Sequence, residues 1–119
     1  MSMRLLTAGE VERQILSLSD RLEDETNRYA DVAELAALAE ADFKGCHARA
    51  LLAFADATVG SRKATVDERR AQADLDAEDA YAIYRLNEAR LDACKQALYS
   101  LRTRLDALRT LAANIRAQS

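Results

Sequence analysis

The chain has 119 residues, half of them apolar and 31% charged, with no proline, three glycines and a formal net charge of −3. This length supports one domain, and the composition is typical of long helices and coiled coils. A single histidine and the lack of any phosphate-binding or nucleophile motif argue against an enzyme, and no Cys or His pair has metal-ligand spacing. We expect one non-enzymatic helical domain over residues 1–119, without metal or cofactor.

The sequence shows no targeting signal, and its charge changes along the chain. Residues 1–8 lack an apolar segment long enough for a signal peptide, and no apolar run approaches the roughly 20 residues that cross a bilayer, so a cytoplasmic protein without membrane contact is expected. Residues 1–42 carry a net charge of −6 and residues 90–119 a net charge of +4. The acidic arm is expected to neutralise the basic arm; a basic face left for an anionic partner is the alternative.

The first arm is predicted over about residues 8–57. Residues 7–10 have capping-box spacing, which predicts a helix start near Ala8. From residue 11 to residue 53 apolar residues recur in alternating steps of four and three residues and form a stripe along the helix. Glu25 is the only polar member of this stripe. This is the period of a left-handed coiled coil. Weak helix formers leave two alternatives open near residues 24–28, an uninterrupted helix and a kink.

A basic turn over residues 58–65 separates the two arms. Thr65 and Glu68 repeat the capping-box spacing and predict that the second arm begins near Val66. The turn and its flank hold four cations within nine residues, namely Arg62, Lys63, Arg69 and Arg70. Few β-branched residues and no period-two alternation are present, so no strand is expected.

The second arm is predicted over about residues 66–116 with the same seven-residue period. Its early stripe is rich in Ala and its late stripe in Leu, and Leu layers bury more apolar area. Asn87 lies on this stripe. It either fixes the register of the helix–helix seam that the stripe forms or is solvated at the edge of that seam. The residues predicted to join subunits of a homo-oligomer are Leu91, Cys94, Leu98, Leu101, Leu105, Leu108 and Ile115. The subunit number, and whether the arms pair within a chain or swap between chains, stay open.

Cations near the turn are the candidate nucleic-acid site. Single strands are held by cations along their backbone, and repetition in an oligomer multiplies weak contacts. The alternative is that these side chains have no binding role and are solvated or paired with carboxylates such as Asp67 and Glu68. The predicted site residues are Lys44, His47, Arg49, Arg62, Lys63, Arg69 and Arg70.

Part of this region resembles a known family. The stretch from Arg49 to Leu52, the loop with Gly60 and residues 62–65, and residues 68–93 together resemble the UvsY family of phage recombination mediators. The resemblance covers roughly residues 40–116. It implies a homo-oligomer that binds single-stranded DNA and helps load a recombinase past the single-strand-binding protein. The family has a Lys-Ala-Arg-Leu type of segment; here Arg49 is retained and His47 stands in place of Lys, which removes a charge at neutral pH.

These observations define the expected fold and function. The expected fold is all-α, an elongated hairpin of long helices with coiled-coil-like packing, assembled as a homo-oligomer. The expected function is that of a non-enzymatic recombination mediator on single-stranded DNA, in the bacterial host if the protein is phage-encoded. The alternative is a helical adaptor or inhibitor module that docks on a protein through its acidic first arm and binds no nucleic acid.

Overall fold

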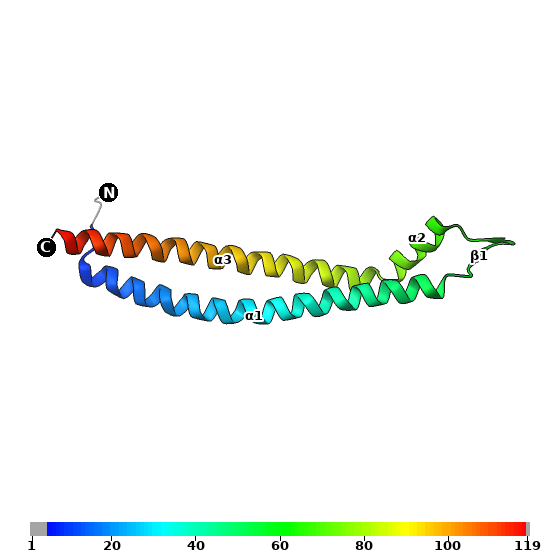
Figure 1. Ribbon diagram of the computed structural model, residues 1–119, viewed down its shortest axis with the longest axis horizontal. Helices are drawn as coiled ribbons and strands as arrows, with labels where there is room; N and C mark the ends of the chain where they lie inside the picture. Colours follow the sequence, from blue (N-terminus) through cyan, green and yellow to red (C-terminus); the bar gives the residue numbers. More distant parts are fainter. Residues whose placement is uncertain (1–4, 119) are drawn as a thin grey trace. The chain divides into compact units, whose positions relative to one another are not determined.

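The computed structural model describes residues 5–118 as helices joined by a short β-hairpin (Figure 1). In chain order the elements are α1 (Ala8–Ala53), β1 (Thr58–Val59), β2 (Arg62–Lys63), α2 (Val66–Asp76) and α3 (Glu78–Ala117). The expected all-helical class is confirmed. The described residues form two compact units, the first from residues 5–31 with 92–118 and the second from residues 32–91.

The first unit packs the start of α1 against the end of α3, and the two segments lie side by side in Figure 1. Its core consists of Leu18, Leu101 and Leu105, which are buried at 3% to 5% exposure. Partly buried Ile15, Leu22 and Leu108 pack around them. Burial of such leucines is the main stabilising term for a helix pair, because the apolar stripe of each helix is removed from water.

Helix α1 begins as expected and has no break near residues 24–28. The Thr7 hydroxyl accepts a hydrogen bond from the Glu10 backbone N–H at 3.2 Å, and the Glu10 carboxylate accepts one from the Thr7 backbone N–H at 3.4 Å. This is the predicted capping box. Further along, the Thr26 hydroxyl donates to the Leu22 carbonyl at 2.7 Å inside an uninterrupted helix. A kink there is therefore ruled out in favour of the continuous alternative.

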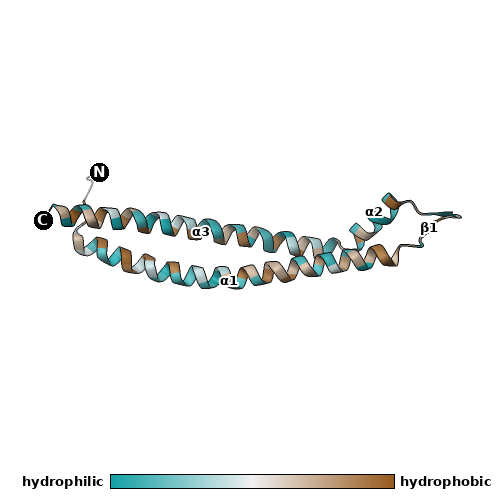
Figure 2. Ribbon diagram, viewed as in Figure 1, coloured by the Kyte–Doolittle hydropathy of each residue, from teal (hydrophilic) through white to brown (hydrophobic). Residues whose placement is uncertain are grey.

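The second unit combines buried alanines with a cluster of aromatic rings, of which Phe43 and Tyr84 are half-buried and Tyr81 is 47% exposed. The Phe43 ring lies 5.2 Å from the Tyr81 ring and 5.6 Å from the Tyr84 ring, measured between centroids. Ala50 and Ala73 are buried in the same unit. Figure 2 shows hydrophilic and hydrophobic bands alternating along α1 and α3, as expected where one face of a helix is covered.

The second arm is not one helix. Ala77 separates α2 from α3 with φ −95° and ψ 8°, and α2 leaves the line of α3 in Figure 1. Backbone hydrogen bonds still continue across the break, from Ala77 N–H to the Ala73 carbonyl at 3.0 Å and from Tyr81 N–H to the Ala77 carbonyl at 2.9 Å. Nothing in the local sequence predicts this bend, since residues 73–81 contain no Gly or Pro.

The turn between the arms is a β-hairpin, so the expectation of no strand is wrong here. Thr58 pairs with Lys63 and Val59 with Arg62 in antiparallel register. Gly60 adopts φ 63°, the left-handed conformation that a two-residue hairpin loop needs. Period-two alternation cannot reveal strands of two residues each, because the pattern needs four or more to be recognised.

The residues predicted to join subunits are used within the chain. Cys94, Leu98, Leu101 and Leu105 are buried in the single chain, and Leu91, Leu108 and Ile115 are half-buried. Leu101 and Leu105 reach this state by packing against Leu18 of α1. The seven-residue period thus corresponds to a seam between the two arms of one chain. That these residues join subunits stays a prediction.

Candidate nucleic-acid interface

Arg62 is fixed by an acidic neighbour. Its guanidinium donates two hydrogen bonds to the Glu68 carboxylate, at 2.7 and 3.0 Å. Glu68 also accepts the Thr65 backbone N–H at 3.1 Å, which completes the capping box of α2. The Arg62 guanidinium, followed by the Thr65 hydrogen bonds, lowers the pKa of Glu68 from 4.5 to about 2. Glu68 is therefore ionised at neutral pH and offsets the charge of Arg62.

Arg69 has a structural contact. Its guanidinium donates to the Ala55 carbonyl at 2.8 Å, just after the end of α1. That carbonyl lies beyond the helix and gains a partner, which ties the start of α2 to the segment leading into the hairpin. Arg69 is half-buried as a result.

Lys63 and Arg70 are the accessible cations of the turn. Both side chains are exposed, and within residues 5–118 neither takes part in an ion pair or a side-chain hydrogen bond. Lys63 follows Arg62 on β2, and successive side chains on a strand point to opposite faces. Since Arg62 turns toward Glu68, Lys63 points to the other face of the hairpin.

The three predicted site residues on α1 are also engaged. Lys44 pairs with Glu40 at 2.7 Å, and this hydrogen bond raises the pKa of Lys44. The His47 ring lies 2.8 Å from the Asp74 carboxylate. The Arg49 guanidinium lies over Gly45 and 3.5 Å from the Cys46 sulfur, folded back along its own helix. Of the seven predicted residues, five therefore have partners among the described residues.

A second group of cations was not named among the predicted site residues, although the net charge of residues 90–119 left a basic face for an anionic partner as one alternative. Lys95, Arg102 and Arg109 are exposed on α3 and spaced seven apart, with exposed Tyr99 between the first two. The signal that could have found them is this spacing inside a segment of net charge +4. Asn87, also on the predicted stripe, donates to the Ile83 carbonyl at 2.8 Å and is half-buried.

Metal-ligand clusters and membrane-spanning helices are both lacking within residues 5–118. No group of three or more His, Cys, Asp or Glu side chains in this range is placed to hold a metal ion. None of the helices in the same range combines the length and the apolar character that a membrane crossing requires.

Comparison with protein-family models, with curated proteins and with solved structures gave no match.

Proposed function

We propose that this protein is a non-enzymatic recombination mediator that binds single-stranded DNA and helps to load a recombinase on it. The resemblance of residues 40–116 to phage recombination mediators suggests the role, with the recombinase and the single-strand-binding protein as its partners. The surface proposed to contact DNA is the hairpin end, which consists of the β-hairpin and the first turns of α2.

The observation that carries the proposal is the accessibility of Lys63 and Arg70. Unpaired, exposed cations can exchange water and counterions for phosphates without first breaking a protein contact. Arg62 contributes less at the outset because Glu68 holds it on two hydrogen bonds. Exposed ion pairs are weak, however, so a phosphate can compete for the guanidinium.

A few phosphate contacts per chain give weak binding, so the mediator role needs several copies acting together. The surface proposed to join them is the unit-two apolar patch, in which every side chain is more than half exposed. Its members are Leu35 at 55%, Leu38 at 61%, Ile83 at 54% and Leu86 at 51%. Large apolar side chains gathered on a surface are typical of interaction sites.

Helix geometry places these four side chains on one flank of the second unit. Glu40 and Glu88 each follow a seam position, 36 and 84, by four residues and therefore lie on one flank of the seam. Leu35 on α1 and Ile83 on α3 precede the seam positions 36 and 84 and lie on the opposite flank. Leu38 and Leu86 follow each of them by three residues and extend the same face.

Charges at the two ends of the patch favour a second copy as the occupant. Exposed Arg90 follows Leu86 on α3 at one end, and exposed Asp42 follows Leu38 on α1 at the other. Two copies related by a two-fold axis through the patch would bring the Arg90 of each toward the Asp42 of the other. Self-complementarity of this kind is what a symmetric dimer interface requires.

A titration of labelled single-stranded DNA at two salt concentrations tests the binding. We expect the Lys63→Ala/Arg70→Ala variant to bind about tenfold more weakly and to lose about 1.4 from the slope of log affinity against log salt. The matched control is Arg13→Ala/Arg21→Ala, which removes the same charge from exposed positions on α1. Equal affinities of the two variants, or no binding by the unmodified chain at about 50 mM salt, would refute the hairpin-end interface.

The patch also favours the alternative, a helical protein-interaction module without nucleic-acid binding. Sedimentation of Leu38→Glu/Leu86→Glu beside the control Leu16→Glu, which changes an exposed leucine of the first unit, separates the two. The mediator proposal expects the unmodified chain to form oligomers that only the patch variant dissociates. A monomeric unmodified chain that binds no DNA and retains protein partners from nuclease-treated extract would favour the adaptor.

A further inference from the structure

A line of cations runs along the exposed side of α3 in the first unit. Lys95, Arg102 and Arg109 recur every seven residues, which is nearly two helical turns, so their side chains lie one above the other. Tyr99 stands four residues after Lys95 and three before Arg102, so it lies on the same face. We call these four residues the α3 basic face; it is about 21 Å long at 1.5 Å per residue.

The cations of this face are largely free. Among the residues that the structure describes, the side chains of Lys95 and Arg102 take part in no ion pair or hydrogen bond. Arg109 has Asp106 as its ion-pair partner, and the closest atoms are 3.9 Å apart, which is a loose contact. These groups can therefore bind an anion without first breaking a strong ion pair or hydrogen bond.

The Tyr99 ring is an open aromatic surface. Its residue is 70% exposed, and within residues 5–118 the ring has no aromatic neighbour. In the second unit, by contrast, the rings of Phe43, Tyr81 and Tyr84 contact one another. An unpacked ring gains apolar contact only when a planar or apolar group of a partner covers it.

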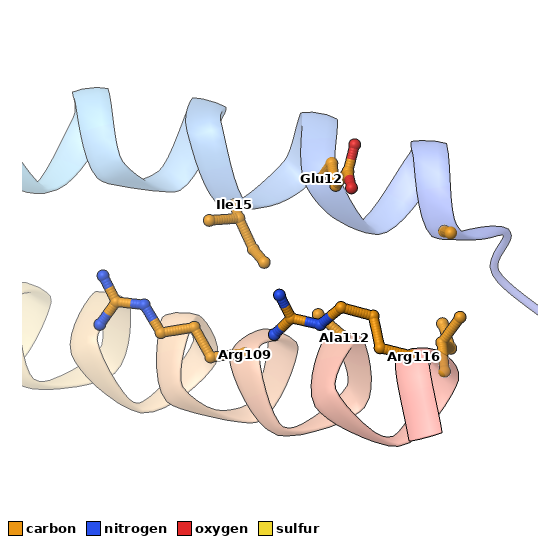
Figure 3. Close-up of a pocket in the computed structure, with 7 residues that line it drawn as sticks. Glu12, Ile15, Arg109, Ala112 and Arg116 are labelled. Carbon is orange, nitrogen blue, oxygen red and sulfur yellow. The ribbon is translucent and has the colours of Figure 1, made fainter. Parts of the chain in front are cut away.

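Packing explains where the aliphatic stem of Arg109 lies. Arg109 and Arg116 line a pocket of about 160 Å³ with Ile15, Ala112 and Glu12. Figure 3 shows both guanidinium groups beside Ile15 of α1. The aliphatic stem of an arginine covers apolar surface while its charged end stays at the water boundary.

We propose that the α3 basic face is a second binding site for single-stranded nucleic acid. Lys95, Arg102 and Arg109 contact phosphates, and Tyr99 stacks on an unpaired base. Cations that follow a backbone together with an exposed ring are the chemistry of single-strand recognition, because every base has a face that can stack. The inference extends the proposed function to another surface, and it can hold where the hairpin-end interface fails.

The test uses the full chain and two fluorescent probes of about 16 nucleotides, an oligothymidine and an abasic strand of the same length and charge. Lys95→Ala/Arg102→Ala is expected to bind both probes about tenfold more weakly than the control Arg13→Ala/Arg21→Ala. Tyr99→Ala is expected to bind oligothymidine about tenfold more weakly and the abasic strand unchanged, while Tyr99→Phe keeps both affinities. Circular dichroism of each variant confirms that its helices are intact.

The outcomes separate this site from the hairpin end. If only Lys63→Ala/Arg70→Ala weakens binding, the α3 basic face is refuted and the hairpin-end proposal stands. If only the α3 variants weaken binding, the hairpin-end proposal is refuted and the α3 basic face stands. Equal loss of both probes in Tyr99→Ala would refute the stacking role, and binding by Lys95→Ala/Arg102→Ala at the level of the control would refute the site itself.

Discussion

The two units share one seven-residue sequence period, but different residue types occupy its packing positions. In the first unit the seam is made of leucines, with Leu18, Leu101 and Leu105 buried together. In the second it is made of alanines and of the rings of Phe43, Tyr81 and Tyr84. Leucine layers bury more apolar surface than alanine layers, so a larger share of the stability is expected from the first unit.

The units also differ in how their cations are used. In the second unit Lys44, His47 and Arg62 each face a carboxylate at 2.7 or 2.8 Å. In the first unit Lys95 and Arg102 have no such partner among the described residues. The densest cluster of cations in the sequence is thus only partly accessible, because Glu68 neutralises Arg62 while Lys63 and Arg70 stay unpaired within residues 5–118.

The largest expected effect tests the leucine seam. Leu105→Ala should lower the free energy of unfolding by about 2–5 kcal/mol, because it removes buried methyl groups and leaves a cavity. Leu16→Ala, at a position 67% exposed in the same unit, should change it by less than about 0.5 kcal/mol. Urea unfolding followed by circular dichroism measures both, and similar losses for the two variants would contradict the packing of the first unit.

A smaller effect is expected from two glycines of the second unit. Gly60→Ala should destabilise the chain by about 1 kcal/mol, because φ of 63° is unfavourable for a residue with a Cβ atom. Gly45→Ala should stabilise it by about 1 kcal/mol through helix propensity, since the added Cβ meets only the end of the flexible Arg49 side chain at 3.1 Å. Thermal unfolding of both variants measures these opposite signs, and equal signs would contradict the assignment.

Releasing Arg62 from its ion pair with Glu68 tests whether pairing limits the contribution of a cation to DNA binding. Glu68→Gln should raise the affinity for single-stranded DNA a few-fold, because it releases a guanidinium held by two hydrogen bonds and removes a negative charge. Glutamine at this position still supports a capping box. Asp67→Asn removes the same charge one residue earlier and serves as the control in the oligonucleotide titration. A larger gain from Asp67→Asn would show that the ion pair does not limit Arg62.

The smallest expected effect is the loss of the stabilisation from Glu68 as the pH is lowered. Because the pKa of Glu68 is lowered from 4.5 to about 2, the stabilisation from its pairing is fully present above about pH 4.5 and is lost as the pH falls through about 2. The carboxyl resonance of Glu68, followed by NMR, should titrate in that window. In Arg62→Ala its midpoint should move up toward 4.5. A midpoint near 4.5 in the unmodified chain would mean that the ion pair does not form in solution.

Much of the fold follows from local sequence signals. The helix starts at Ala8 and Val66 were predicted from capping boxes, because those hydrogen bonds involve residues only three apart. The seven-residue stripe predicted which faces are covered, since it depends only on helix periodicity. The bend at Ala77 and the two-residue strands were missed, because no Gly, Pro or long alternating pattern marks them.

The candidate site could be predicted only in part. The sequence shows that cations gather near the turn, but pairing depends on acids brought from elsewhere, such as Asp74 facing His47 across 27 positions. By itself the sequence determined a helical chain with two apolar stripes and a basic turn, because helix period, capping and charge are local properties. Only the tertiary structure decided that the stripes cover each other, that Arg62 is held by Glu68, and that Lys95 and Arg102 are left open, because which side chains meet depends on how the arms pack.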